Sequence, residues 1–208
     1  MKRSREQSFK LLEDDFYKRD TLTVAKELVG KVMQHTTPKG VISVIINETE
    51  AYTQDEASCH AFSGKSDRNR AMFMEGGHIY IYKIYGMHRC INFVTEYEGR
   101  GCAVLLRGVL PLESSELLLG TAKNVCKLLD GPAKLMKNLS IPFEYYGMKI
   151  NDESCPIKIY ESDYEPLDLK ETPRIGISRA QDLPWRFIAS EFTNYENRRP
   201  NCRKKVIS

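Results

Sequence analysis

Long apolar segments are the first thing that this sequence lacks, and their absence bears on where the protein can act. No apolar run approaches the roughly 18 residues that a membrane-spanning helix needs. The segment from Met1 to Gln7 also contains no apolar stretch of the kind found in a secretory signal. We therefore expect a protein that works without a membrane, in the cytoplasm or, in a eukaryotic cell, in the nucleus.

Closely spaced metal ligands are absent as well. The six cysteines form no Cys-x-x-Cys pair, and the four histidines show no His-x-x-x-His or Glu-x-x-His spacing on a plausible helix. In a chain without an export signal, such cysteines are expected to be reduced and mostly buried thiols. The alternative is a zinc site assembled from distant residues, with candidates Cys59, His60, His78 and His88. We expect no metal and no cofactor.

What is present is the composition of an ordinary globular protein. The chain has 208 residues, of which 41% are hydrophobic and 28% are charged, and its net charge is only +3. This length is enough for one sizeable core, and no low-complexity linker or internal repeat divides it. We expect a flexible segment over residues 1–14 and a single domain over residues 15–208. The basic residues after Asn197 could contact phosphates or simply keep the terminus solvated.

Helix and strand signals alternate along the chain. Helices are expected at 21–29, with Asp20 as N-cap and Gly30 behind it, at 111–119, and at 133–139 after Gly131-Pro132. Strands are expected at 41–46 with an extension to Tyr52, at 79–82, at 90–94, at 102–106, and in short pieces between 155 and 180, including Arg174 to Ile177. Adjacent runs joined by a short turn favour antiparallel pairing. The sequence therefore predicts an α+β fold with a mixed, mostly antiparallel β-sheet and surrounding helices.

A β-hairpin is predicted where Tyr80 begins the run YIYKIYGMHRCIN. Tyr80 and Tyr82 alternate with isoleucines, as the pleat of a strand requires, and Tyr85 stands where the run is interrupted. An aromatic ring at a hairpin tip is hard to bury. With Lys83 and Arg89 beside it to hold phosphates, such a ring suits insertion between nucleic-acid bases. The alternative is a core strand whose tyrosines simply pack.

Two carboxylates follow the apolar run at 41–46. If this run continues to Tyr52 as one strand, then Glu48, Glu50 and Tyr52 share a face. A carboxylate beside an aromatic ring can act as a general base toward water next to a planar substrate. The alternative is a solvated strand end with two surface acids. The residues alone do not distinguish Glu50 from Glu48 as the base.

Several short motifs occur in a fixed order between residues 15 and 190. They are Glu48-Thr49-Glu50-Ala51-Tyr52, His60, Arg68-Asn69-Arg70, Tyr80-x-Tyr82-x-x-Tyr85-Gly86-Met87, Asn92, Leu105-Leu106-Arg107, Gly131-Pro132-Ala133-Lys134-Leu135, Arg174-Ile175-Gly176-Ile177 and Pro184-Trp185-Arg186-Phe187. This order resembles the alkyladenine (3-methyladenine) DNA glycosylase family, whose members remove damaged purines from DNA. Asp67 is a departure, because the family usually has proline at that position.

The resemblance implies a catalytic group that contains Glu50 and Arg107. Glu50 would be the general base for the water that attacks the sugar C1′ as the bond to the base breaks through an oxocarbenium-like state. Arg107 would help to hold that water and the nearby phosphate, and the backbone at Ile175-Gly176 would complete the water site. The matching motifs supply no amine nucleophile, so base removal should leave an abasic site.

The resemblance also implies a substrate pocket and a DNA-contacting surface. Tyr52, His60 and Tyr82 would stack on a flipped base and favour cationic purines, while Asn92 would crowd the 2-amino group of normal guanine. The residues implied to contact DNA are Tyr85, which is the wedge that fills the vacated space, Met87, Arg68 and Arg70. The implied fold is a single domain with a curved sheet and a protruding β-hairpin that carries this wedge.

The implied protein is a monofunctional DNA glycosylase that acts as a DNA-associated monomer. Its substrate would be double-stranded DNA that contains 3-methyladenine, 7-methylguanine, hypoxanthine or ethenoadenine. One alternative is a non-catalytic damaged-nucleic-acid-binding module with the same hairpin, against which Glu50 argues. The other is the metal-dependent enzyme named above, which insensitivity to a chelator would exclude.

Overall fold

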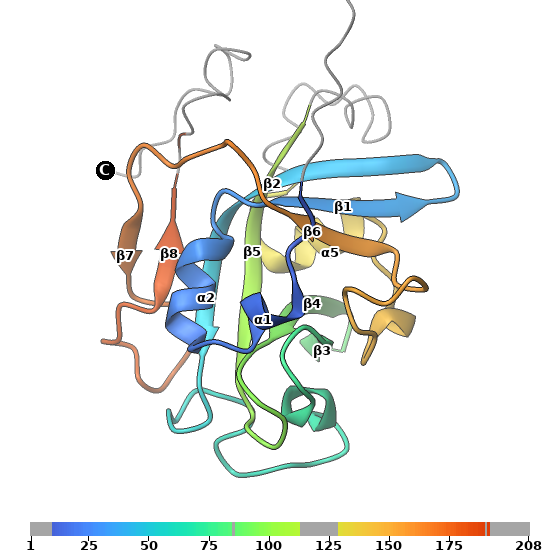
Figure 1. Ribbon diagram of the computed structural model, residues 1–208. Helices are drawn as coiled ribbons and strands as arrows, with labels where there is room; N and C mark the ends of the chain where they lie inside the picture. Colours follow the sequence, from blue (N-terminus) through green and yellow to red (C-terminus); the bar gives the residue numbers. More distant parts are fainter. Residues whose placement is uncertain (1–9, 85, 113–128, 190, 192–208) are drawn as a thin grey trace, which may run out of the picture.

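The computed structural model of the chain describes residues 10–84, 86–112, 129–189 and 191, and its framework is a curled β-sheet (Figure 1). The strands are β1 (Val32–Thr37), β2 (Gly40–Tyr52), β3 (Ile79–Ile84), β4 (His88–Val94), β5 (Ala103–Pro111), β6 (Ile157–Tyr160), β7 (Lys170–Thr172) and β8 (Arg186–Ile188). Their order is β3-β4-β5-β2-β1-β6, with β8 paired to β2 and β7 paired to β8. Each of these pairs is antiparallel. The predicted α+β fold is confirmed.

β2 is the central strand because it has neighbours along both edges. On one edge its first half pairs with β1 and its second half pairs with β8 over Glu48 to Glu50. β5 runs along the other edge, from Val44 to Tyr52. The predicted extension to Tyr52 is therefore confirmed, with a bulge between Ile46 and Thr49 that shifts the register. This places the polar end of β2 between two other strands.

Short helices surround the sheet. Those in the described part of the chain are α1 (Asp14–Tyr17), α2 (Thr21–Leu28), α5 (Pro132–Asn138) and the 3-10 helices η1 (Arg70–Phe73) and η3 (Phe143–Tyr145). Asp20 caps α2 because its carboxylate accepts a hydrogen bond from the Thr23 N–H at 2.9 Å. Gly30, just beyond the helix, has a φ of +96°, which glycine adopts readily. The predicted helices at 21–29 and 133–139 are confirmed.

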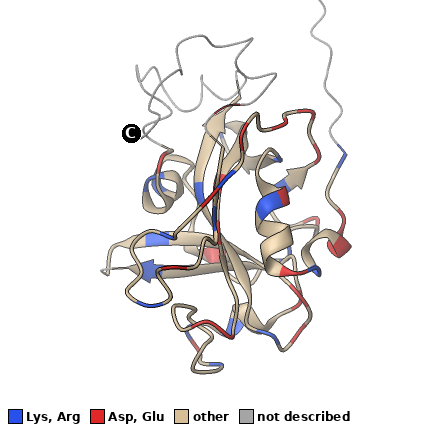
Figure 2. Ribbon diagram, turned by 90° about the vertical axis from the view of Figure 1, so that its left-hand side faces the viewer, with Lys and Arg blue, Asp and Glu red and all other residues tan. Residues whose placement is uncertain are grey.

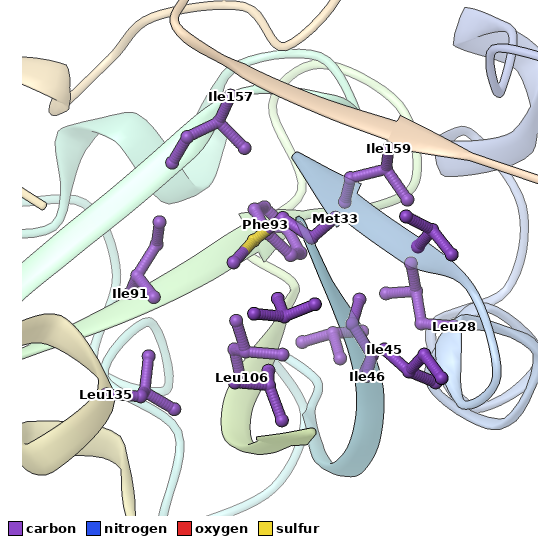
Figure 3. Packing of buried hydrophobic residues seen from close by; sticks show 14 of the residues in the cluster. Leu28, Met33, Ile45, Ile46, Ile91, Phe93, Leu106, Leu135, Ile157 and Ile159 are labelled. Carbon is purple, nitrogen blue, oxygen red and sulfur yellow. The ribbon is translucent and has the colours of Figure 1, made fainter. Parts of the chain in front are cut away.

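Two clusters of buried side chains stabilise this arrangement. The main one receives side chains from α1, α2, α5, the strands β1 to β6 and β8. The residues of this cluster labelled in Figure 3 are Leu28, Met33, Ile45, Ile46, Ile91, Phe93, Leu106, Leu135, Ile157 and Ile159. Removing each such side chain from water contributes about 1.5–3 kcal/mol. The smaller cluster contains Cys59, Ala61, Ala71, Met72, Phe73, Tyr80, Val94 and Ala103. Tyr52 and Tyr82 are partly buried against this smaller cluster, which thus holds the rings of two predicted site residues.

The predicted hairpin is present as β3 and β4. Tyr80 faces Asn92 across the pair and is 1% exposed, so this tyrosine packs in the core. Met87, near the tip, is 81% exposed. Tyr85, the expected wedge, lies outside the described residues.

The strand expected at 102–106 is longer than predicted. β5 continues through Arg107 to Pro111, so the expectation that Pro111 opens a helix is wrong, and residues 113–119 of that helix lie outside the described residues. Proline is tolerated there because β5 pairs with β4 only over Ala103 to Leu105. The missing N–H of Pro111 therefore has no ladder partner to lose on that side, while the next residue, Leu112, donates to the Ser43 carbonyl at 2.9 Å.

The strand expected at Arg174 to Ile177 is also wrong. This segment is irregular in the structure. The Ile175 N–H donates to a side-chain carboxylate, that of Glu50, at 2.8 Å rather than to a neighbouring strand. A side-chain contact of this kind competes with strand pairing, and it brings a sequence-distant loop onto the polar end of β2.

The structure describes only part of the segment from residue 1 to residue 14, which was expected to be flexible. Residues 1–9 of the segment expected to be flexible lie outside the described residues, whereas Leu12 is 2% exposed and its N–H donates to the Ile159 carbonyl at 2.9 Å. The basic residues after Asn197 lie outside the described part as well.

The described cysteines are buried free thiols, and the described charges are of mixed sign. Cys59, Cys90, Cys102 and Cys155 are free and buried, as expected, and the other two cysteines lie outside the described residues. Basic and acidic residues are interspersed over the described ribbon (Figure 2), which accords with the small net charge of +3. Among the described helices, none is long and apolar enough to cross a membrane.

Candidate active site

Two carboxylates and an arginine meet at the polar end of β2. Glu50 is 0% exposed and Glu48 is 5% exposed. Arg107, on the neighbouring strand β5, reaches both: its Nε lies 3.0 Å from Glu48 Oε1 and its Nη1 lies 3.4 Å from Glu50 Oε1. The prediction that Glu48 and Glu50 share a face is therefore confirmed, and the alternative of two solvated surface acids is wrong.

A glycine allows β5 to approach this end of β2 closely. Gly108 pairs with Glu48 at the bulge. A Cβ atom at Gly108 would come within 2.7 Å of Asn47 Oδ1 and 3.0 Å of Glu48 Cβ. Both distances are shorter than ordinary contacts, so a side chain at this position would push the two strands apart. Gly108 thereby keeps Arg107, its neighbour in β5, within reach of the carboxylates.

The two carboxylates have different partners. Glu48 Oε1 accepts hydrogen bonds from two guanidinium groups, Arg107 Nε at 3.0 Å and Arg186 Nε at 2.6 Å. Glu50 accepts from two neutral donors instead, the Ile175 N–H to Oε1 at 2.8 Å and the Tyr52 hydroxyl to Oε2 at 2.8 Å. Glu48 is thus the counter-ion of two arginines, whereas Glu50 has one arginine at longer range.

Burial dominates the acidity of Glu50. Removal from water raises the pKa of the Glu50 carboxyl above 4.5, and the charge of Glu48 raises it further. The Arg107 charge, the Ile175 N–H and the Tyr52 hydroxyl lower this pKa, but they do not offset the burial. A carboxylate with a raised pKa is a stronger base than an ordinary glutamate, which is the property a general base needs.

The predicted ring residues gather next to this carboxylate. Tyr52 donates its hydroxyl to Glu50, and Tyr82 is close enough to Glu50 that the carboxylate charge adds to burial in raising the pKa of the Tyr82 hydroxyl. His60 and Tyr82 make an edge-to-face contact with ring centroids 4.6 Å apart. The structure therefore brings Tyr82 to His60 and Tyr52 to Glu50.

His60 is held by a neighbouring tyrosine. Its Nδ1 lies 2.9 Å from the hydroxyl of Tyr80. Burial, followed by the positive charge of Arg68, lowers the pKa of the His60 imidazole below 6.5. The ring is therefore neutral at pH 7, with its orientation fixed by Tyr80.

Asn92 lies on β4, opposite Tyr80 in the hairpin. It is 3% exposed, and its Nδ2 donates to the Tyr80 carbonyl at 3.0 Å across the hairpin. Its side chain is thus anchored to the same strand that carries Tyr82.

Cations and aromatic rings gather beside the hairpin on what we call the cation–aromatic face. Its members are Arg68, Arg70, Lys83, Arg89, Phe143 and Tyr146. Lys83 Nζ and Arg89 Cζ lie 5.5 and 5.7 Å from the Phe143 ring centroid, and Arg70 Cζ lies 5.9 Å from that of Tyr146. Arg68 donates to the Lys83 carbonyl at 3.3 Å. The exposed Asp67 forms no ion pair with any of these cations among the described residues, so both predicted arginines, Arg68 and Arg70, remain uncompensated by it.

Sequence reasoning missed three charged residues around the carboxylates. Arg186 was noted only within its motif, yet it binds Glu48. Arg174 and Glu56 form a buried ion pair with N···O distances of 2.7 and 3.0 Å. Only the motifs around Arg174 and Arg186 could have drawn attention to them. No local pattern marks Glu56, because its partner is 118 positions away.

A metal site was the alternative use of the histidines and cysteines. Within residues 10–84, 86–112, 129–189 and 191, no group of three or more His, Cys, Asp or Glu is arranged to hold a metal ion. His60 and His78 use their Nδ1 atoms in contacts with Tyr80 and the Glu75 carbonyl instead.

Comparison with known proteins gives a consistent family assignment. The family model described as methylpurine-DNA glycosylase matches residues 15–192. A relative from Chlorobaculum parvum is 40% identical over 201 residues, covering 94% of this chain and 95% of the relative. A relative from Sodalis glossinidius is 42% identical over 178 residues, covering 85% and 95%, and one from Wolbachia pipientis is 41% identical over 180 residues, covering 85% and 90%. All three carry the name "Putative 3-methyladenine DNA glycosylase".

These matches first define the class, which is that of hydrolases acting on N-glycosyl bonds. Within that class, the chain belongs to the methylpurine-DNA glycosylase family, a family of DNA-repair enzymes with DNA as substrate. The resemblance drawn from the ordered motifs is thereby confirmed.

Proposed function

We propose that this protein is a monofunctional DNA glycosylase that flips alkylated or deaminated purines out of duplex DNA and hydrolyses their N-glycosidic bond with water activated by Glu50. One observation carries this proposal. Glu50 is 0% exposed, yet its carboxylate faces an arginine and two neutral donors rather than a tight counter-ion. A pure binding module gains nothing from such a buried, basic group.

The chemistry assigned to Glu50 balances without a second carboxylic acid. Glu50 takes a proton from water as the water oxygen bonds to C1′, and the electron pair of the breaking C1′–N bond leaves with the base. An alkylated purine already carries positive charge, so it departs as a neutral base. Neutral hypoxanthine must first gain a proton, and its release should be slower for that reason.

The surroundings of the two acids favour Glu50 over Glu48 as the base. Glu48 forms ion pairs with both Arg107 and Arg186. Protonation of Glu48 would break both ion pairs. Arg107 keeps its own charge, since the two carboxylates raise the pKa of its guanidinium. It can therefore hold the attacking water and a nearby phosphate while Glu50 accepts the proton.

Recognition of the base is assigned to the rings. Tyr52, His60 and Tyr82 offer electron-rich faces that attract a cationic purine. The neutral state of His60 matters here, because a charged imidazole would repel 3-methyladenine or 7-methylguanine. Asn92 is assigned to the exclusion of normal guanine by crowding its 2-amino group.

Duplex engagement is assigned to the hairpin and the cation–aromatic face. Arg68 and Arg70 would hold phosphates, and Met87 together with Tyr85 would occupy the space that the flipped nucleotide leaves. The role of Tyr85 rests on the sequence. The reaction needs one C1′ and one Glu50, so we propose a monomer that associates with DNA.

Base removal without strand cleavage follows from the kind of groups at the site. A lyase step needs an amine nucleophile to form a Schiff base. Among the described residues, no lysine forms a hydrogen bond or an ion pair with Glu50, Tyr52 or Arg107. The product should be an intact strand with an abasic site.

The test uses duplex oligonucleotides that carry a single 7-methylguanine, ethenoadenine or hypoxanthine, incubated with the protein and a chelator. Breaks that appear only after hot alkali would support a metal-free, monofunctional glycosylase. The same assay is run on Glu50→Gln, which should release no base. Its matched control is Glu98→Gln, which changes an exposed glutamate in the same way. Binding without any break on all three lesions would instead indicate the damage-binding module, and chelator-sensitive breaks would indicate a metal enzyme.

A further inference from the structure

Arg174 is a fully buried arginine that no role described so far requires. Its side chain is 0% exposed. Nη1 donates to Glu56 Oε1 at 2.7 Å and to the Ala51 carbonyl at 2.8 Å, and Nη2 donates to Glu56 Oε2 at 3.0 Å. Burying such a pair is costly unless the hydrogen bonds are well formed, so its presence beside a catalytic site calls for an explanation.

The guanidinium also lies against two aromatic rings. Arg174 Cζ is 4.6 Å from the Tyr52 ring centroid and 5.2 Å from that of Trp185. Trp185 is the only tryptophan in the chain. Its carbonyl accepts a hydrogen bond from the Ala51 N–H at 2.9 Å, which ties this stack to the backbone of β2.

Glu56 anchors the other side of the pair. Besides Arg174, its Oε2 accepts hydrogen bonds from the Ser58 N–H at 2.8 Å and the Ser58 hydroxyl at 2.7 Å. The Arg174–Glu56 pair therefore joins the segment before β8 to two consecutive segments far from it in sequence, the end of β2 and the loop that leads on to His60.

Both neutral donors of Glu50 lie directly beside this pair. One is the Ile175 N–H, which belongs to the residue next to Arg174. The other is the hydroxyl of Tyr52, whose ring stacks on the Arg174 guanidinium. A displacement of Arg174 would move both donors while leaving Arg107 in place on β5.

We propose that Arg174, held by Glu56, is a positioning residue that fixes the Ile175 N–H and the Tyr52 hydroxyl on the two oxygens of Glu50. The proposal rests on the assignment of Glu50 as the general base. Arg174 touches neither the reacting atoms nor the DNA; it acts through Tyr52 and Ile175.

The proposal has a consequence for the pKa of Glu50. The groups that face Glu50 are Arg107 from β5, Glu48 and Tyr52 from β2, Tyr82 from β3, Cys90 from β4 and the Ile175 N–H. Of these, the Ile175 N–H and the Tyr52 hydroxyl stabilise the carboxylate and lower its pKa. Loosening Arg174 should remove part of both contributions, so the pKa of Glu50 should rise further.

The experiment compares Arg174→Lys and Glu56→Gln with the control Asp55→Asn. Asp55 is adjacent to Glu56 and also binds an arginine, Arg100, but that pair is on the surface and contacts neither Tyr52 nor Ile175. Single-turnover release of 7-methylguanine is measured against pH, with rates normalised to active enzyme. This lesion is already cationic, so the acidic limb of the profile reports Glu50 rather than protonation of the base.

We expect Arg174→Lys and Glu56→Gln to lower the single-turnover rate by about 10- to 100-fold, as small misplacements of reacting groups do. The acidic limb should move to higher pH, and affinity for undamaged duplex DNA should be unchanged, because no flipped base occupies the pocket of Tyr52 there. Asp55→Asn should match the wild type in all three. If both variants lose only thermal stability and keep the wild-type rate and pH limb, the positioning role is excluded.

Two readouts that need no activity separate this proposal from the proposed function. Emission from Trp185 should change in Arg174→Lys and not in Asp55→Asn, since only the first alters the stack. Titration of the Glu50 carboxyl by carbon NMR in the free protein should show a higher pKa in Arg174→Lys. If Glu50 in Arg174→Lys titrates with the same pKa as in the wild-type protein, the proposal is overturned. If that pKa is shifted but the wild-type protein has no glycosylase activity, only the function assigned to Glu50 is overturned.

Discussion

Glu48 and Glu50 are two positions apart on one strand, but their neighbours make them chemically different. Two arginines pair with Glu48, whereas Glu50 is buried with a raised pKa and neutral hydrogen-bond donors. The sequence could predict that both acids share a face, because the period of a strand is local. The sequence could not predict which of the two acids is the better base. That difference depends on Arg107, Arg186 and Ile175, which are far along the chain.

The first prediction separates the two acids. Glu50→Gln should reduce base release by about 10²- to 10⁴-fold, the usual contribution of a general base, while lesion DNA is still bound. Glu48→Gln should lose less rate per active molecule and more stability, because it leaves Arg107 and Arg186 short of a counter-ion. Single-turnover kinetics and thermal unfolding of both variants provide the comparison. Normal turnover by Glu50→Gln would refute the mechanism.

The second prediction concerns pH. As the proposed general base, Glu50 has to be ionised, so release of 7-methylguanine should rise with pH through the raised pKa of Glu50 and then stay level. Release of hypoxanthine should fall again at higher pH, since this neutral base needs a proton to leave, and its profile should be bell-shaped. Rates on the two lesions across a pH series would show this difference. Identical profiles for both lesions would contradict the leaving-group argument.

Among the elements, the β3–β4 hairpin combines a buried base with an exposed tip. Tyr80 is packed in the smaller core cluster, while Met87 is 81% exposed. The sequence predicted the hairpin from period-2 alternation and an interrupted run, both of which are short-range signals. It missed that Phe143 and Tyr146 come to lie beside Lys83, Arg89 and Arg70, because that contact depends on how a distant 3-10 helix packs.

A third prediction tests the cation–aromatic face. Lys83→Ala and Arg89→Ala should each reduce the slope of log affinity against log salt concentration by about 0.9, the value for one neutralised phosphate. Lys39→Ala, in the turn between β1 and β2, is the exposed control. Affinities for the same duplex over a range of salt concentrations supply the slopes. Slopes equal to that of the wild type would place the phosphates elsewhere.

A fourth prediction concerns the hairpin tip. Tyr85→Ala should weaken engagement of a lesion in duplex DNA, because unstacking costs a few kcal/mol that the wedge partly offsets. The same lesion in a single strand should be processed as by the wild type, since no stacked neighbour has to be replaced. Unchanged duplex affinity would contradict the wedge role.

At the scale of the whole molecule, the burial of Glu50 couples the stability of the fold to pH. A group whose folded pKa is raised contributes stability that is fully present below its unfolded pKa and is lost as pH rises through the folded pKa. Glu50 is such a group. The sequence predicted the α+β class of the fold correctly. It did not predict that β5 continues through Pro111, because the tolerance of proline there depends on where the neighbouring strand β4 ends.

The fifth prediction follows from the loss of stability that ionisation of Glu50 causes as pH rises. Glu50→Gln should raise the stability of the protein at pH 7 by about 0.5–2 kcal/mol, as substitutions that relieve functional strain commonly do. For a chain of this size, 1 kcal/mol corresponds to a change in Tm of about 2–4 °C. The gain should diminish at acidic pH, where Glu50 in the wild type is protonated. A gain that does not depend on pH would show that ionised Glu50 is not the source.

The four described thiols bear on how readily electrophiles can modify the protein. Burial raises the pKa of Cys59 to about 12 and the pKa values of Cys90 and Cys102 to about 11, and it raises that of Cys155 as well. The thiolate, not the thiol, is the nucleophile that attacks alkylating agents. Cys90 lies next to Tyr82, so a methyl group on its sulfur would disturb the rings at the site. By keeping these sulfurs protonated and out of water, the fold shields the four described cysteines from electrophiles.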